Sequence, residues 1–455
     1  MLFRGKREKV NQQSRGWLRP VALVLVASLI LAALALITAR NSASSPHPLG
    51  PILGSPAQSS APAAIAALRD NIAGYEPIAR AGNDWLYWGT VAQDALGLAQ
   101  LTGNYDDFTR AQRALDEAFK IAADRAGPHA LLASFNFSVH RLSASEIALD
   151  QTKRYALPDP PYKQAEYLAM RGDIALYQGD YAKALAAYGK AAIDGAPASA
   201  LCRQALFESW MGMPDAALAT INACELAAPT RTPQFAASAA MQRGVIELNR
   251  GNWDAARVHF IGSEKHFPGH WMTAMRLAQM RALGGDLDGA IVDFIAIANQ
   301  TGNPEPMDIL GKLYRAKGNA VASKAWAARA GALWAKRINQ FPEAAAGHAL
   351  EHELAFGDPK AALALAKINV RARPYAESFL GLAKAWLANG RPDFTVALVE
   401  KVNRSGWVST QQYLLLSEAQ AIRGQADESE AARMMAIKIN PRAGERNAAF
   451  NWLDH

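Results

Sequence analysis

Cysteine and β-branched residues are scarce in this 455-residue chain. It has only two cysteines, Cys202 and Cys224, which are too few for a disulfide framework and lack the partners and spacing of a zinc site. Val, Ile and Thr are infrequent outside the N-terminus, whereas Ala is common and half of all residues are hydrophobic. This composition favours helices that pack closely through small side chains, so we expect an all-α protein.

Clustered charge is also missing from most of the chain. The formal net charge of +7 arises almost entirely in residues 1–40, which contain seven basic side chains and one acidic side chain. The other 415 residues hold 41 basic and 40 acidic side chains. A surface balanced in this way has no excess positive charge to displace counterions from a phosphate backbone, so the sequence predicts no nucleic-acid partner.

Catalytic motifs are absent, with one exception. The sequence has no Gly-rich loop after a strand, no G-x-S-x-G and no P-loop. The exception is His348-Ala-Leu-Glu351-His352, which matches H-x-x-E-H, where two histidines bind zinc and the glutamate is the general base. Three defined residues are easily matched by chance, and no third ligand is evident. We therefore expect no enzyme, no metal and no cofactor, and a zinc-dependent peptidase using these residues is the alternative.

An uncharged apolar run occupies residues 21–39, VALVLVASLILAALALITA. At 1.5 Å per residue, such a helix covers a hydrocarbon core of roughly 30 Å. Six basic residues precede the run and only Arg40 follows it closely, so the positive-inside rule places the N-terminus in the cytoplasm and the rest of the chain outside. A cleaved signal peptide is the competing interpretation, although the run is longer than an ordinary signal core.

The predicted organisation has five parts. A basic cytoplasmic leader occupies 1–20, and the transmembrane helix occupies 21–39. A linker rich in proline and serine follows at 40–63, where the prolines block helix and sheet. A repeat region extends over 64–441, and a polar tail, 442–455, is expected to cap the last groove.

The repeat region consists of pairs of amphipathic segments joined by short turns. In the clearest unit, which begins at Ala165, the small residues are Gly172, Ala184 and Ala191, with Tyr188 between them. Small residues at these spacings let two antiparallel helices approach closely, and a glycine at the turn ends the first helix in the left-handed conformation. The turn residues of successive copies are Gly103, His140, Gly179, Gly212, Gly251, Gly285, Gly318, Gly357, Gly390 and Gly424.

These units resemble the tetratricopeptide repeat, which has a period of about 34 residues. The resemblance implies an α-solenoid of about nine to ten tetratricopeptide-like hairpins, in addition to the transmembrane helix. It also implies that the first helix of each hairpin lines a concave groove that receives an extended peptide or a partner helix. The polar residues at the family's groove positions are Asp173, Asn249, Gln279, Asp308, Lys312, Arg315, Glu351 and Lys384.

The two cysteines lie at equal distances from Met213, on the two helices of one predicted hairpin. In an oxidising compartment this symmetric placement would favour a disulfide between the two cysteines. The repeat frame, however, places Cys224 at a core position and Cys202 on the concave face, so their Cβ vectors should diverge. We favour two small apolar residues that do not pair, with a disulfide as the alternative.

Together these features predict a membrane-tethered scaffold for protein–protein interaction, whose partners are proteins or peptides bound in the groove. The predicted location is the inner, or plasma, membrane, crossed once, with the N-terminus cytoplasmic and the repeats periplasmic. That location suggests a role in assembling envelope or secretion components. A cytosolic adaptor, with its repeats inside the cell, is a third interpretation.

Overall fold

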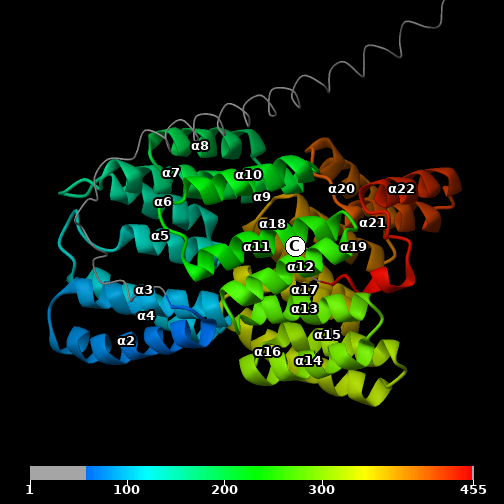
Figure 1. Ribbon diagram of the computed structural model, residues 1–455, viewed down its shortest axis with the longest axis horizontal. Helices are drawn as coiled ribbons and strands as arrows, with labels where there is room; N and C mark the ends of the chain where they lie inside the picture. Colours follow the sequence, from blue (N-terminus) through cyan, green and yellow to red (C-terminus); the bar gives the residue numbers. More distant parts are fainter. Residues whose placement is uncertain (1–57, 453–455) are drawn as a thin grey trace, which may run out of the picture.

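The computed structural model describes residues 58–452, and within that range the fold is built from helices alone (Figure 1). The helix α2 (Ala61–Ala81) comes first, ten hairpins follow, and the 3-10 helix η1 (Arg446–Phe450) is last. The hairpins are α3 (Trp85–Thr102) with α4 (Tyr105–Ile121), α5 (His129–Ser138) with α6 (Leu142–Thr152), α7 (Pro161–Tyr177) with α8 (Tyr181–Asp194), α9 (Pro197–Trp210) with α10 (Pro214–Ala227), α11 (Pro233–Asn249) with α12 (Trp253–His266), α13 (Trp271–Leu283) with α14 (Leu287–Thr301), α15 (Pro304–Ala316) with α16 (Ala320–Gln340), α17 (Pro342–Phe356) with α18 (Pro359–Ala372), α19 (Ala376–Ala388) with α20 (Pro392–Arg404), and α21 (Thr410–Ile422) with α22 (Ala426–Ile439). The prediction of an all-α repeat solenoid is confirmed.

Short connections between the helices follow from the residues that start each helix. Proline is the first residue of α7, α9 and α17, a position where its missing N–H removes no helical hydrogen bond. Asp180, Asp286 and Asp358 each accept a hydrogen bond from a backbone N–H in the first turn of the helix that follows. Because each new helix begins so soon after the last one ends, neighbouring helices fold back on each other.

Close packing inside a hairpin depends on the small residues that mark the repeat. A Cβ atom at Gly172 would overlap the ring of Tyr188, and one at Gly244 would overlap the ring of Phe260. Both rings are almost completely buried. The glycine on the first helix therefore makes room for an aromatic side chain of the second helix, as the repeat pattern predicts.

Nine of the ten predicted turn residues adopt a left-handed backbone, including the non-glycine His140. The exception is Gly357, whose φ is −112°. There α18 begins after only one further residue, Asp358, whose N–H is bound by the side chain of Glu353 at 2.9 Å. In a left-handed turn, the corresponding N–H donates to a backbone carbonyl oxygen. Here the carboxylate of Glu353 accepts the hydrogen bond from Asp358 instead.

The structure corrects the expectation for the cysteines. Cys202 on α9 and Cys224 on α10 form a disulfide, with their Cα atoms 5.4 Å apart. Cys224 is fully buried, as predicted, but the side chains converge. In an antiparallel hairpin, residues at equal distances from the turn lie at the same height, and here this symmetry outweighs the difference in their predicted faces.

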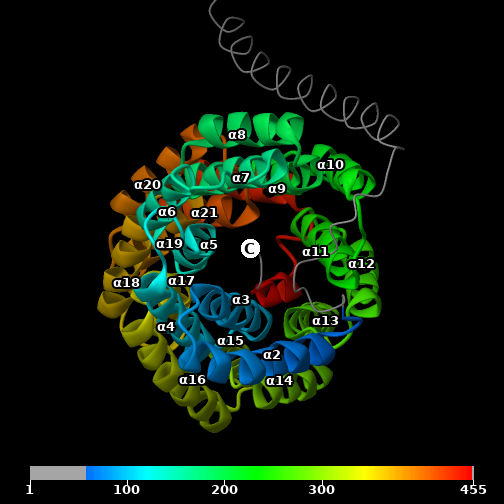
Figure 2. The same ribbon diagram turned by 90° about the vertical axis from the view of Figure 1, so that its left-hand side faces the viewer.

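Seen from its left-hand side in Figure 1, the solenoid forms a ring with two layers of helices (Figure 2). The first helices of the hairpins, such as α9, α11 and α13, make the inner layer. The second helices, such as α10, α12 and α14, make the outer layer. The inner layer is the concave face that the repeat resemblance predicts.

The solenoid makes more than one circuit, and the second circuit packs on the first. Asn303, before α15, donates from Nδ2 to the carbonyl oxygen of Thr102 at 2.9 Å, although 201 residues separate them. His140 donates from Nδ1 to the carbonyl oxygen of Glu343 at 3.1 Å, across 203 residues. The turn of the first hairpin thus meets the start of the seventh, and the turn of the second meets the start of the eighth. One circuit therefore contains six hairpins.

We call this set of contacts the seam. The turns of the first-circuit hairpins contribute residues 102–108, 135–141, 177–181, 210–213 and 251–253 to it. The second circuit contributes residues 303, 337–343, 373–376, 407–408 and 440–442.

Aromatic rings fill much of the seam. Phe341, which is 2% exposed, packs its ring about 6 Å from those of Tyr105, Phe108 and Phe135. Tyr375 and Trp407 pack in the same way against Tyr177 and Trp210. Burial of these rings stabilises the contact between circuits.

The later turns differ from those in the seam. Among the described residues, a Cβ atom at Gly318, Gly390 or Gly424 would have no atom within 4 Å. At Gly179, by contrast, a Cβ atom would lie 2.8 Å from the carbonyl oxygen of Pro374. The second-circuit turns therefore form an open edge of the solenoid.

The predicted leader 1–20 and transmembrane helix 21–39 lie outside the described residues, as does most of the linker 40–63. The helix α2 begins at Ala61 rather than at the predicted start of the repeat region at 64. Between residues 58 and 452, no helix combines the length and apolar character needed to cross a membrane.

Candidate functional site

The eight predicted groove residues all lie on inner-layer helices (Figure 2). They come from six different hairpins and do not form one cluster. Several of them hold neighbouring helices together, and others remain accessible on the inner face.

Asp173 of α7 is a structural acceptor between three helices. Its Oδ1 accepts a hydrogen bond from the hydroxyl of Tyr188 on α8 at 2.9 Å, and its Oδ2 accepts one from Nε of Arg203 on α9 at 2.7 Å. Burial raises the pKa of Asp173, and the charge of Arg203 opposes that rise. Because its partners stand on different helices, Asp173 fixes the junction between the third and fourth hairpins.

Asp308 of α15 has a similar position in the seventh hairpin and is 8% exposed. Its Oδ2 accepts a hydrogen bond from Nε1 of Trp334 at 2.8 Å. Its Oδ1 accepts one from Nδ1 of His352 at 2.6 Å. Both carboxylate oxygens are thus engaged inside the protein.

The same contacts bear on the predicted zinc motif. Nδ1 of His352 binds Asp308, and its other ring nitrogen faces Gly331, where a Cβ atom would lie 2.9 Å away. The ring of His348 stacks on Trp334 with centroids 5.9 Å apart. Across residues 58–452, no three His, Cys, Asp or Glu side chains gather as metal ligands do. Nothing in this arrangement supports the peptidase alternative.

Charged residues remain accessible on the inner helices α15, α17 and α19. Glu351 and Lys384 form an ion pair at 3.1 Å, and their side chains are 42% and 32% exposed. Lys312 is half-buried. Arg315 is exposed but lies over the ring of Phe356 and donates to the carbonyl oxygen of Ala355 at 2.8 Å. This part of the inner face therefore presents charge of both signs.

The remaining two predicted residues lie on α11 and α13. Asn249 is half-buried next to the seam. Gln279 is fully buried and donates from Nε2 to Oδ1 of Asn451 at 2.8 Å. The polar tail thus lies on the sixth hairpin, whereas the sequence predicted that it would cap the last groove.

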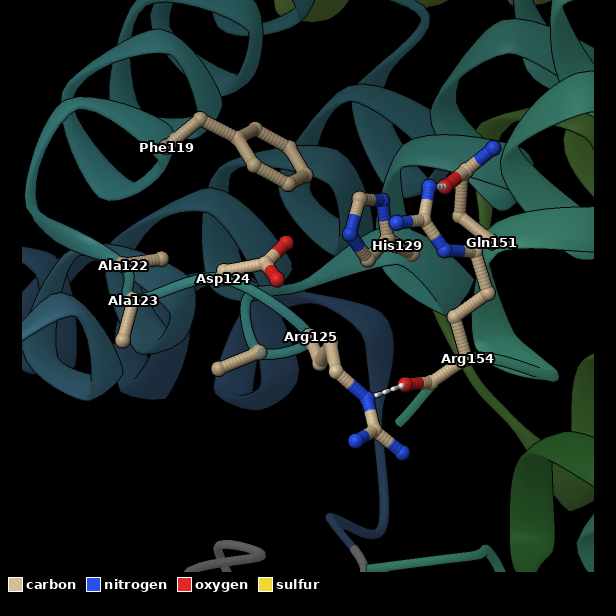
Figure 3. Close-up of a pocket in the computed structure, with 9 residues that line it drawn as sticks. Phe119, Ala122, Ala123, Asp124, Arg125, His129, Gln151 and Arg154 are labelled. Carbon is tan, nitrogen blue, oxygen red and sulfur yellow. Dashed lines mark hydrogen bonds between the residues drawn. The ribbon is translucent and has the colours of Figure 1, made fainter. Parts of the chain in front are cut away.

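A cavity of about 200 Å³ lies where α4, α5 and the end of α6 meet. Figure 3 shows the ring of His129 between Phe119 and the guanidinium group of Arg154. Nε of Arg125 donates to the carbonyl oxygen of Arg154 at 3.0 Å. Burial lowers the pKa of His129, and the charge of Arg154 lowers it further. Asp124 is the one acidic residue of the lining, beside the basic Arg125 and Arg154.

A second cavity, of about 440 Å³, lies between α2, α3 and α5. Its lining includes Leu68, Gln100 and Leu131 together with Asp94, whose pKa is raised by burial.

The sequence did not indicate the seam or the contacts of the C-terminal segment. Phe341, Tyr375 and Trp407 stand just before or at helix starts, where a bulky residue is also typical of ordinary packing between repeats. Asn447, Phe450 and Trp452 lie in a segment too short and irregular to show any periodicity.

No family model matches the sequence, and no curated protein matches it significantly. The structure is similar to a tetratricopeptide repeat protein from Parabacteroides merdae, with 14% identity, 56% of this chain and 96% of that chain covered, and a TM-score of 0.33. It is similar to PilW, described as a widely conserved type IV pilus biogenesis factor, with 21% identity, 45% and 91% coverage, and a TM-score of 0.37. For yeast Tom70 the identity is 13%, the coverage 93% and 94%, and the TM-score 0.36. Scores this low imply nothing about what this chain binds, and the repeat assignment rests on the ten hairpins themselves.

Proposed function

We propose that this chain is a scaffold that binds a protein partner on the inner face of its solenoid. The observation that carries the proposal is the inner layer of first helices, which presents the accessible, oppositely charged pair Glu351 and Lys384. Solenoids of stacked hairpins expose extended concave surfaces of this kind for binding.

We further propose that the N-terminal apolar run tethers the scaffold to a membrane and that the repeats act on its extracytoplasmic side. The distribution of basic residues around 21–39 supports this orientation. The disulfide between Cys202 and Cys224 also supports it, because such bonds persist mainly in oxidising compartments. Assembly of envelope or secretion components is the role that fits this location.

Site-specific photo-crosslinking in intact cells tests the binding surface. A photoreactive amino acid replaces Glu351 or Lys384 on the inner layer, and matched control variants carry it at Val258 or Val321. These valines lie on the outer helices α12 and α16 and are 66% and 83% exposed. We expect a protein adduct from the inner positions only, and equal capture from the outer positions would contradict the proposed surface.

The tether and its orientation are tested separately. A reporter active only outside the cytoplasm is fused after His455, and membranes are extracted with alkaline carbonate. We expect an active reporter and a chain that stays with the membrane. An inactive reporter, or release of the chain by carbonate, would contradict the proposed location.

A further inference from the structure

The C-terminal segment turns away from the outer wall of the solenoid after the seam. Asn440 and Pro441 meet the turn at Gly251, and Arg442 lies over the ring of Trp253 at 3.7 Å. The following helix, η1, lies inside the ring of helices and contacts α13 (Figure 2). The segment thus leaves the wall and lies on the inner face.

Polar contacts fix this segment in the way that a bound peptide is fixed. Nε2 of Gln279 donates to Oδ1 of Asn451 at 2.8 Å and reaches the carbonyl oxygen of Phe450 at 3.4 Å. Nδ2 of Asn447 donates to the carbonyl oxygen of Leu283, the last residue of α13, at 3.2 Å. One inner-face side chain thus contacts both the backbone and a side chain of the segment, which gives register as well as affinity.

Two aromatic side chains anchor the segment. Phe450 packs against apolar residues of α11 to α13, and Trp452 lies with its ring 6.4 Å from that of Phe294. Both rings are only half-buried, whereas Phe294 is fully buried. Aromatic anchors in a polar surround are characteristic of binding interfaces, and incomplete burial makes them easier to release than core residues.

We propose that residues Arg446–Trp452 are an intramolecular ligand that covers a partner-binding surface on the inner face of α13. This proposal rests on the proposed scaffold function. The partner it implies is a protein segment of the same chemistry, two aromatic residues separated by an asparagine or a similar amide. Binding of that partner displaces the C-terminal segment.

The test uses the full chain and a fluorescently labelled peptide with the sequence of residues 444–455. In the variant Phe450→Ala/Trp452→Ala, the segment loses its anchors, so the peptide should bind. In the unaltered chain, the tethered segment competes at high effective concentration, and the peptide should bind at least about tenfold more weakly. Fluorescence anisotropy gives both affinities.

Matched controls identify the surface. Adding Gln279→Ala to the double variant should weaken peptide binding about tenfold, because the substitution removes the hydrogen bonds that set the register. Phe394→Ala/Ile422→Ala changes exposed residues elsewhere in the second circuit and should leave the peptide affinity of the unaltered chain unchanged. A double variant that is folded by circular dichroism but does not bind the peptide would overturn the proposal.

Hydrogen exchange on the unaltered chain provides a measurement that needs no variant. The amides of Phe450, Asn451 and Trp452 should exchange much faster than those in the middle of α13, because the segment opens locally. Equal protection would identify a permanent cap and overturn the proposal. Photo-crosslinking from Glu351 distinguishes the two hypotheses, because a captured partner there supports the scaffold function even if the peptide fails to bind.

Discussion

The turns of the third and ninth hairpins have nearly the same backbone but opposite surroundings. Gly179 and Gly390 have φ values of 78° and 71°. The turn at Gly179 lies in the seam beside Tyr177 and Tyr181, and the turn at Gly390 lies on the open edge beside Ala388 and Arg391. The repeat frame requires the glycine in both places, whereas the aromatic neighbours occur where the second circuit covers the turn.

This contrast separates two sources of stability in one solenoid. Contacts within and between adjacent hairpins are available to every repeat protein. Contacts in the seam join hairpins six units apart, and only the first circuit has its turns covered in this way.

The largest effect should come from the aromatic seam. Phe341→Ala removes a buried ring from its contacts with Tyr105, Phe108 and Phe135 and should lower the free energy of unfolding by about 3–5 kcal/mol. Phe394, which is 40% exposed on the outer helix α20, is the matched control, and Phe394→Ala should cost about 1 kcal/mol or less. Urea unfolding followed by circular dichroism measures both. Equal losses would mean that the seam adds no stability.

The disulfide should rank next. It closes a loop of 22 residues in the fourth hairpin, and its loss should cost about 3 kcal/mol through the greater freedom of the unfolded chain. Thermal unfolding with and without reductant measures the effect. The variant Cys202→Ala/Cys224→Ala should unfold at the same temperature under both conditions. If reductant leaves the unaltered chain unaffected, the hairpin alone holds this region.

A matched pair of glycine substitutions separates the effect of packing in the seam from the effect of the left-handed backbone conformation. Gly179→Ala and Gly390→Ala share the cost of a left-handed alanine, about 1 kcal/mol. Only at Gly179 does the new methyl meet a backbone carbonyl, that of Pro374, at 2.8 Å. The Gly179 variant should therefore be less stable than the Gly390 variant by about 2 kcal/mol, as measured by denaturant titration. A smaller penalty at Gly179 than at Gly390 would contradict the described packing of the two circuits.

The smallest effect should be a weak dependence on pH at the seam. Burial and the nearby charge of Arg373 hold the pKa of His140 well below its ordinary value of 6.5. Between the folded and unfolded pKa values the unfolded chain binds more protons, so stability is lost as pH falls below about 6.5. His140→Asn, which tolerates the left-handed turn, should reduce that loss when melting temperatures at pH 7.5 and pH 5.5 are compared. An unchanged difference would assign the pH dependence to other groups.

The sequence was most informative where structure depends on local spacing. The small residues Gly172, Ala184 and Gly244 each need only a neighbour in the same hairpin, and all three pack as their spacing predicts. The turn at Gly357 departs from the pattern because Glu353 provides an alternative acceptor for a backbone N–H. Such a substitution by a side chain does not show in the positions of glycine and alanine.

Contacts between distant hairpins could not be derived in this way. Whether Phe341 reaches Tyr105 depends on how many hairpins complete a circuit, and small rotations accumulated over six units set that number. For the same reason the repeat frame placed Asp173 and Asp308 on inner helices but could not show that neighbouring helices engage them. Glu351 and Lys384 remain predictions as partner-binding residues.

The stacking of one circuit on the other also bears on how the chain folds. Repeat arrays normally contain only contacts close in sequence, which lets them form progressively as the chain emerges. Here Asn303 must reach Thr102 and Phe341 must reach Tyr105. The aromatic turns of the early hairpins therefore stay uncovered during synthesis until more than two hundred further residues have been added. During that interval their exposed rings can associate with other apolar surfaces, so a chaperone would need to shield them.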